Sequence, residues 1–216
     1  MSGSHRTAEG GSPPLDEELL ADLEARLRQR ELQRDQVYDR ARRLRRAAQT
    51  LMVRLHAGTA RPEEAAALRQ ELAAFGGELR DELRAESPLA LDALQEGVEA
   101  LLLEAVHRDT RLPGPAELGI PPEPYLLGLG DLVGEVRRLA LRALAEGHVD
   151  RAEERLGLME ALYHALMRFD APRGIVALKP KQDTARSLLE RTRGDVTMAR
   201  VLLRAHLAPP PAEGPR

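Results

Sequence analysis

The sequence predicts an all-α fold in which about six to seven helices, several of them long and antiparallel, form one bundle. Three observations predict it. Ala, Leu, Glu and Arg are abundant and β-branched residues are few, which favours helix along the whole chain. Apolar residues recur at helical spacing, and no stretch alternates as a strand does. With 216 residues and 43% hydrophobic content, the chain can bury one sizeable core, and that core must be aliphatic because there are 2 Phe, 3 Tyr and no Trp.

Composition divides the chain into one helical domain between two tails. Residues 1–14 are rich in Gly, Ser and Pro, so we expect a disordered N-terminal tail. The helical domain is expected to cover residues 15–207. The Pro-rich residues 208–216 should then form a flexible C-terminal tail.

The first two helices are separated by a short turn. The first is expected over 15–57 and should end at Gly58. The second is expected over 62–85, with a proline in its first turn and an interruption or kink near Gly76. The apolar seam of the first helix has the near-heptad spacing of a bundle helix. It consists of Ala41, Leu44, Ala48, Leu51 and Leu55.

Capping and breaking residues place the remaining elements. We expect helices over 88–110, 122–146, 151–169 and 180–206. Ser87 and Asp150 are the expected N-caps of the third and fifth helices. Prolines and glycines predict a loop over 111–124, and Gly147 should end the fourth helix.

Two pairs of carboxylates are the most informative feature of the chain. Glu96 and Glu99 are spaced i, i+3 on the third predicted helix, and Asp131 and Glu135 are spaced i, i+4 on the fourth. Each pair therefore projects from one side of its helix. If these helices face each other, the acids form a cage for a hard divalent cation such as Mg²⁺. Phosphodiester cleavage uses such a cation to neutralise phosphate charge and to activate water.

Spacing alone also allows a purely structural interpretation of these acids. Solvated acidic faces are common on helices, and Glu135 can pair with Arg138 or Arg142 of its own helix. In a second structural interpretation the acids form salt bridges between subunits of an inactive helical oligomer.

Four segments resemble, in order and spacing, the translin family. They are QEGVEAL (95–101), PYLLGLGDLVGEVRRLAL (124–141), LMEALYHALMRFD (158–170) and LKPKQDTARSLLERTRGDVT (178–197). The resemblance covers about residues 20–205 and is greatest to the TRAX-like branch, which includes single-gene prokaryotic relatives. It implies a translin-like helical bundle, assembly into a hollow homo-octamer, and Mg²⁺-dependent endoribonuclease activity on single-stranded RNA. Binding of single-stranded DNA or RNA is the property that the family shares.

The resemblance also implies roles for individual residues. Glu96, Glu99 and Asp131 match the catalytic acids, and together with Glu135 they are expected to hold Mg²⁺, with Mn²⁺ as the alternative ion. The family usually carries an aromatic residue between the two glutamates, whereas this chain has a glycine followed by a valine. The translin branch proper has a weaker or absent catalytic set. A non-catalytic protein that binds RNA or single-stranded DNA is therefore the alternative function.

Charge is distributed unevenly along the chain. The net charge of -3, from 32 basic and 35 acidic residues, argues against a protein that grips duplex DNA over its whole surface. Residues 40–54, RARRLRRAAQTLMVR, nevertheless contain six arginines and no acid. This patch could track phosphates, or it could be a solvated helix face or supply salt-bridge partners. With the resemblance, the expected nucleic-acid-binding residues are Arg42, Arg43, Arg45, Arg46 and Arg138. Because aromatic residues for base stacking are scarce, we expect weak sequence preference and steep salt dependence.

The last predicted helix carries a second basic group. It comprises Lys179, Lys181, Arg186, Arg191 and Arg193, with Glu190 among them. By analogy with the family, we expect this helix to contact other subunits rather than substrate.

Two further patterns favour structural interpretations. Gly128, Gly130 and Gly134 lack the spacing and the preceding strand of a dinucleotide loop. Since glycine inside a helix costs about 1 kcal/mol relative to alanine, close packing of a neighbouring helix is the favoured explanation. Glu104 and His107 resemble half of a di-iron site, but that site needs a second such pair and two further glutamates.

Neither the cysteine count nor hydropathy indicates export or a membrane. The chain has no cysteine, which fits a reducing cytoplasm. Its N-terminus has no apolar segment of a signal peptide, and no apolar run approaches the roughly 18 residues of a spanning helix. We therefore expect a cytoplasmic protein that has no membrane partner.

Overall fold

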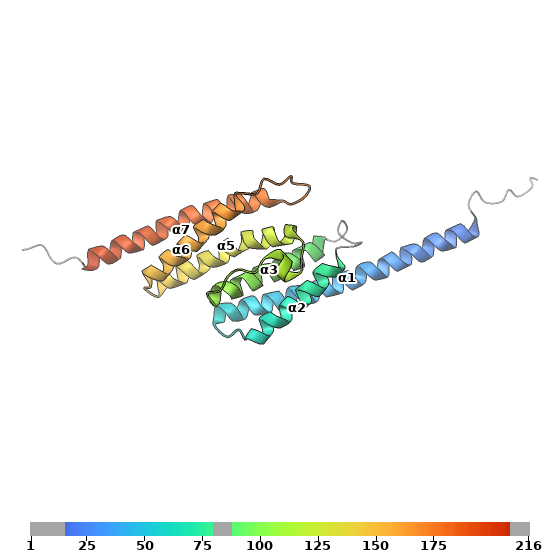
Figure 1. The fold of residues 1–216 in the computed structure, drawn as a ribbon, viewed down its shortest axis with the longest axis horizontal. Helices are drawn as coiled ribbons and strands as arrows, with labels where there is room; N and C mark the ends of the chain where they lie inside the picture. The colour runs from blue at the N-terminus through green and yellow to red at the C-terminus, as the bar shows by residue number, and fades with distance from the viewer. Residues whose placement is uncertain (1–15, 80–87, 208–216) are drawn as a thin grey trace, which may run out of the picture.

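The computed structural model describes residues 16–79 and 88–207, and these residues form helices without any strand (Figure 1). The helices are α1 (Glu17–Ala57), α2 (Pro62–Glu78), α3 (Pro88–His107), α4 (Pro115–Leu118), α5 (Pro122–Ala145), α6 (Val149–Leu166) and α7 (Leu178–Leu207). The prediction of an all-α bundle with long helices is confirmed. The predicted tails and the expected cap at Ser87 lie outside the described residues.

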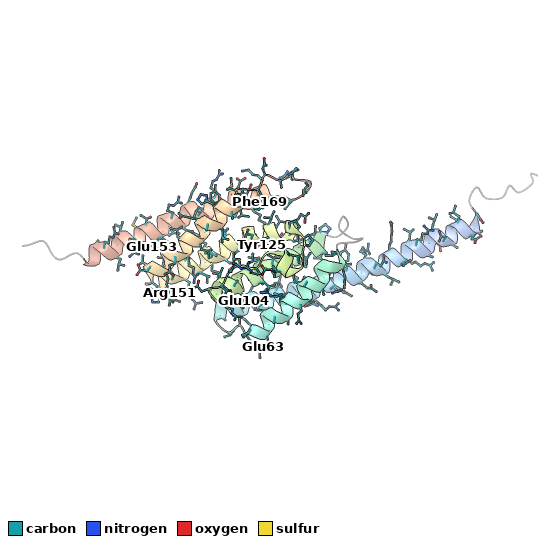
Figure 2. All side chains as sticks on the ribbon, viewed as in Figure 1. Glu63, Glu104, Tyr125, Arg151, Glu153 and Phe169 are labelled. Carbon is teal, nitrogen blue, oxygen red and sulfur yellow. The ribbon has the colours of Figure 1, made fainter. Side chains whose placement is uncertain are left out.

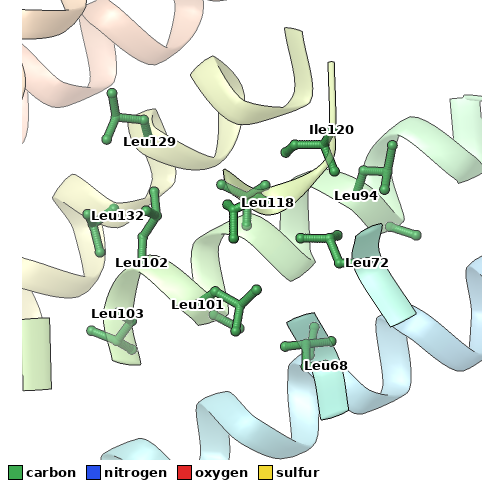
Figure 3. Packing of buried hydrophobic residues seen from close by; sticks show 14 of the residues in the cluster. Leu68, Leu72, Leu94, Leu101, Leu102, Leu103, Leu118, Ile120, Leu129 and Leu132 are labelled. Atoms are coloured by element: carbon green, nitrogen blue, oxygen red, sulfur yellow. The ribbon is translucent and has the colours of Figure 1, made fainter. Parts of the chain in front are cut away.

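Helix α3 is the centre of the bundle. It packs against α1 and α2 on one side and against α5 on the other, and α5 in turn packs against α6 and α7 (Figure 1). Leu101, Leu102 and Leu103 are consecutive and all three are 0% exposed (Figure 3). Because consecutive helical residues point about 100° apart, burial of all three requires neighbours on several sides of α3. Glu96 and Glu99, on the same helix, are only partly exposed.

The predicted seam of α1 is buried over its whole length. All five of its residues, from Ala41 to Leu55, are at most 5% exposed. Gly58 ends the helix with φ of 68°, a left-handed conformation that glycine adopts at little cost. The N-terminal half of α1 extends beyond the other helices, and its Leu19, Leu23 and Leu27 are between 44% and 66% exposed (Figure 1).

Three predictions about individual helices were wrong. Helix α2 runs without interruption through Gly76 and ends at Glu78. The segment expected to be a loop contains the short helix α4, whose Glu117 accepts a hydrogen bond from the backbone N–H of Gly114 at 2.7 Å. Helix α6 begins at Val149, so Asp150 lies in its first turn rather than at its N-cap.

Charged side chains mostly lie on the outside of the bundle. Glu63, Arg151 and Glu153 are exposed examples (Figure 2). Glu104 is an exception at 8% exposed, and its carboxylate accepts a hydrogen bond from Arg108 at 3.1 Å. Arg108 is thus the partner of Glu104 in the structure.

Over the described ranges, no helix combines the length and the apolar character that crossing a bilayer would require.

Candidate functional site

A pocket of about 520 Å³ lies where α1, α3 and α5 meet. Its polar lining consists of Gln49, His56, Gln95, Glu96, Glu99, Asp131, Glu135 and Arg138. The structure thus brings together all four acids that the sequence singled out, two from α3 and two from α5. Arg138 joins them, whereas Arg42, Arg43 and Arg46 lie exposed on α1 and do not line the pocket.

Glycines on α5 allow the neighbouring helices to approach the site closely. A Cβ at Gly128 would lie 2.8 Å from the backbone oxygen of Gln95 on α3, and a Cβ at Gly130 would lie 2.8 Å from the Cβ of Lys181 on α7. Gly134 has no such neighbour, since the nearest atom is Cδ1 of Leu188 at 3.8 Å. Packing therefore accounts for two of the three glycines. Asp131 follows them at the point where α3 and α7 converge on α5.

Glu96 and Asp131 are each held by two basic or amide groups. Glu96 forms an ion pair with Arg45 at 2.7 Å and accepts a hydrogen bond from Gln49 at 3.1 Å. Asp131 accepts a hydrogen bond from Gln95 at 2.5 Å and a second one from the ammonium group of Lys181. Their orientations are thus set by contacts from α1, α3 and α7.

Glu135 contacts a histidine of α1 and not Arg138 or Arg142 of its own helix, the pairing that the structural interpretation allowed. Its Oε2 lies 2.8 Å from Nε2 of His56. Both atoms are buried, and neither has a hydrogen bond of acceptable geometry within the described residues. The separation fits an ion pair, but the alignment does not fit a hydrogen bond. The Glu135 carboxylate therefore retains unused capacity for a donor or a cation.

Glu99 is the acid of this group with no counterion of its own. Among the described residues, no ion pair or hydrogen bond involves its carboxylate. Burial, together with repulsion from Asp131 and Glu135, raises the pKa of Glu99 to about 7, although the nearby Lys181 acts in the opposite direction. A carboxyl group with this pKa exchanges a proton near neutral pH.

These residues have the chemistry to hold a hard divalent cation. Carboxylate oxygens are the ligands that Mg²⁺ and Mn²⁺ prefer, and the mutual repulsion that raises the pKa of Glu99 is what a cation would relieve. In the described residues, however, no three His, Asp or Glu side chains are arranged so that one ion could be held by all of them. Glu96 and Asp131 are paired instead with Arg45 and Lys181. Cation binding would therefore require these carboxylates to exchange partners.

The pKa of Glu99 predicts a pH-dependent stability. In the folded protein this pKa lies above its ordinary value of 4.5, so the stabilisation present below pH 4.5 is lost as pH rises through about 7. Because the carboxyl is only partly buried, we expect the loss to be about 1–2 kcal/mol. The unfolding free energy of Glu99→Gln should therefore match that of the wild type at pH 4 and exceed it by this amount at pH 8.

Chemical denaturation in EDTA at both pH values measures this difference. Glu190→Gln, the same substitution at an exposed position on α7, serves as the control and should change little at either pH. Equal stability of Glu99→Gln and the wild type at pH 8 would contradict the assigned environment of Glu99.

Four residues of the site were not predicted from the sequence, namely Gln49, His56, Gln95 and Lys181. Gln95 adjoins Glu96, and Lys181 lies in one of the segments that carried the family resemblance, so a signal existed for both. The basic residues of the last helix were expected to serve subunit contacts, yet the structure places Lys181 against Asp131.

Comparisons with known proteins agree with this architecture. A model of the translin family matches residues 29–193. A Methanocaldococcus jannaschii protein of uncharacterized function is 40% identical over 116 residues, which are 52% of this chain and 52% of that protein. The chain therefore matches about half the length of this relative.

Solved structures are similar over most of the chain. The crystal structure of AfC3PO and the AfC3PO–duplex RNA complex are each 30% identical and superpose with TM-scores of 0.75 and 0.74. Each covers 85% of this chain and 97% of its own. The crystal structure of apo-NeC3PO, with 23% identity, a TM-score of 0.73 and coverage of 88% and 100%, shows the fold alone.

Fold and site together define an all-helical protein with a carboxylate-lined pocket between its central helices. The chain belongs to the translin family. The resemblance to that family was thus correct, while the narrower assignment to its TRAX-like branch stays a prediction.

Proposed function

We propose that this protein is a Mg²⁺-dependent endoribonuclease of the TRAX-like type that acts on single-stranded RNA. One observation carries the proposal: four carboxylates from α3 and α5 line a single pocket, and Glu99 among them has no counterion in the described residues. Mutual repulsion of acids in one pocket destabilises a fold. A cation site is a physical reason to retain them.

The residues of the pocket would have different roles in such a reaction. Glu96, Glu99 and Asp131, with Glu135 beside them, would hold Mg²⁺, which when bound neutralises phosphate charge and activates water. One of these carboxylates can accept a proton from the attacking water. Arg138, exposed at the pocket, can contact a phosphate of the substrate.

RNA as the ligand is supported by the family and by a relative. The chain belongs to the translin family, and AfC3PO has been solved with duplex RNA. The arginines on α1 add local positive charge to an acidic protein. We propose single-stranded RNA as the substrate, with single-stranded DNA as a further ligand, and contacts to the sugar–phosphate backbone as the main source of affinity.

The function is tested by incubating labelled single-stranded RNA with the protein in Mg²⁺, in Mn²⁺ and in EDTA. We expect internal cleavage with either metal and none in EDTA, while binding measured in EDTA persists. A duplex of the same sequence shows whether cleavage is restricted to single strands. Cleavage that proceeds equally in EDTA would exclude the proposed site.

Substitution of the exposed arginines should weaken RNA binding without removing cleavage. Arg43 and Arg46 are exposed and form no ion pair with another described residue. If each arginine contacts one phosphate, the double variant Arg43→Gln/Arg46→Gln should bind RNA roughly tenfold more weakly at moderate salt. The slope of the logarithm of the binding constant against the logarithm of salt concentration should become shallower by about two. Fluorescence anisotropy over a salt series measures both, and Arg26→Gln with Arg28→Gln near the far end of α1 is the control. An unchanged salt slope would remove these residues from the interface.

A non-catalytic nucleic-acid-binding protein is the second candidate function. It is favoured by the basic contacts that the acids already make, since Arg45, Lys181 and His56 lie against three of the four. In that case RNA binds but stays intact with Mg²⁺ and Mn²⁺. The cleavage assay above separates the two functions.

We further propose that the protein assembles into a homo-oligomer, with the octamer implied by the family resemblance. Exposed apolar residues at the ends of the longest helices support assembly. They are Leu19, Leu23, Leu27 and Leu32 on α1 and Met198, Val201 and Leu202 on α7. Side chains of this kind on projecting helices are typical of surfaces that another chain covers. Light scattering of the purified protein gives the number of subunits.

A further inference from the structure

Lys181 belongs to α7, yet its ammonium group lies inside the cluster of acids on α5 and α3. It donates a hydrogen bond to Oδ1 of Asp131. The two side chains of this pair are 29% and 25% exposed. Both side chains are thus partly withdrawn from water, so their charges are screened less than those of a fully exposed ion pair.

The fold fixes the position of this lysine. Its aliphatic stem crosses α5 at Gly130, where even a methyl group would collide with the Cβ of Lys181 at 2.8 Å. The next residue, Gln182, is 7% exposed and donates hydrogen bonds to the backbone oxygens of Leu166 and Phe169, both at 2.9 Å. These bonds tie the N-terminal part of α7 to the last residue of α6 and to the segment that follows it. The base of the Lys181 side chain therefore cannot leave α5 unless α7 moves.

Neighbouring cations are held less firmly. Arg45, the partner of Glu96, has a side chain that is 45% exposed. Lys179 stands in the same turn as Lys181, but its side chain is 68% exposed and pairs with Asp183 at 2.8 Å, away from the pocket. Lys179 thus provides a matched charge outside the site.

We propose that Lys181 is a positioning residue that acts as a tethered counter-cation: it neutralises Asp131 when no metal is bound and competes with a divalent cation for that carboxylate. The inference rests on the cation site of the proposed function. It has two consequences of opposite sign. Removing the charge of Lys181 destabilises the metal-free protein, and it strengthens the binding of divalent cations.

The test is calorimetric titration of the full chain with Mn²⁺ at pH 7.5. Lys181→Met keeps the unbranched stem over Gly130 and removes the charge, so we expect its Kd for Mn²⁺ to be roughly tenfold lower than that of the wild type. Lys181→Gln, which is also neutral, should give the same direction. Lys181→Arg and the control Lys179→Met should bind as the wild type does. In EDTA, Lys181→Met should have a lower melting temperature than Lys179→Met. In saturating Mn²⁺ the two variants should melt at the same temperature.

The outcomes separate this inference from the function on which it rests. If both neutral variants bind Mn²⁺ no more tightly than Lys179→Met, while Asp131→Asn weakens binding, Lys181 does not compete with the cation and the site itself stands. If Asp131→Asn leaves Mn²⁺ binding unchanged, the cation site fails, and the role of Lys181 fails with it. General damage to the fold would weaken binding, which is the opposite of the expected result.

Discussion

Asp131→Asn should reduce Mg²⁺-dependent cleavage of single-stranded RNA by about 100-fold or more while leaving RNA binding intact. Asparagine has nearly the shape of aspartate and can still accept a hydrogen bond from Gln95, but it loses the charge that holds a hard cation. Even residues that only support a metal ligand change affinity or activity by about 10–100-fold when they are substituted. Loss of a ligand itself should therefore be at least as large.

Initial rates of cleavage and anisotropy of the same labelled RNA measure the two properties separately. Asp183→Asn is the control, because Asp183 is an exposed aspartate of α7 that pairs with Lys179 outside the pocket. Wild-type rates in Asp131→Asn would remove Asp131 from the catalytic set. Equal loss of cleavage and binding would instead assign it to the RNA interface.

Two glycine substitutions on α5 should change stability in opposite directions. The Cβ of Gly128→Ala would lie 2.8 Å from both the backbone oxygen of Gln95 and Cγ1 of Val98, so α3 and α5 must move apart. Such overpacking costs about 1–3 kcal/mol of unfolding free energy. The Cβ of Gly134→Ala meets nothing closer than Leu188 at 3.8 Å. That variant should gain up to about 1 kcal/mol from helix propensity and from lower entropy of the unfolded chain.

Urea denaturation of the two variants and the wild type measures these changes in a matched pair. Because Gly128 sets the distance between the helices that carry the acids, Gly128→Ala should also lower cleavage activity, and Gly134→Ala should not. A Gly128→Ala protein that is as stable as the wild type would show that α3 and α5 are not in the close contact described.

Features that depend on residue spacing along one helix could be predicted from the sequence. The buried seam of α1 and the acid pairs on α3 and α5 each follow from the geometry of a single helix. The meeting of Glu96 and Asp131 in one pocket needed a further assumption about which helices face each other, and the structure bears it out. Family resemblance made that assumption reasonable, since spacing alone did not distinguish a cage of acids from a solvated face.

Features that depend on contacts between helices could not be predicted. His56 and Lys181 lie far from the acids in sequence and reach Glu135 and Asp131 only because α1 packs against α3, next to α5, and α7 packs against α5. Burial of Glu99, which raises its pKa, is likewise a property of the assembled bundle. Helix α4 was missed for a different reason, because four residues among prolines and glycines carry too short a pattern to separate a helical turn from a loop.

The central claim is that acids from two helices share one divalent cation, and anomalous diffraction from crystals grown or soaked in Mn²⁺ tests it most directly. The account predicts an anomalous peak in the pocket between α3 and α5, within about 2.0–2.3 Å of carboxylate oxygens of Glu96, Glu99 and Asp131. It also predicts that the Lys181 ammonium has moved away from Asp131 in those crystals. A pocket without a peak at saturating Mn²⁺, or a well-occupied ion held elsewhere on the chain, would contradict it.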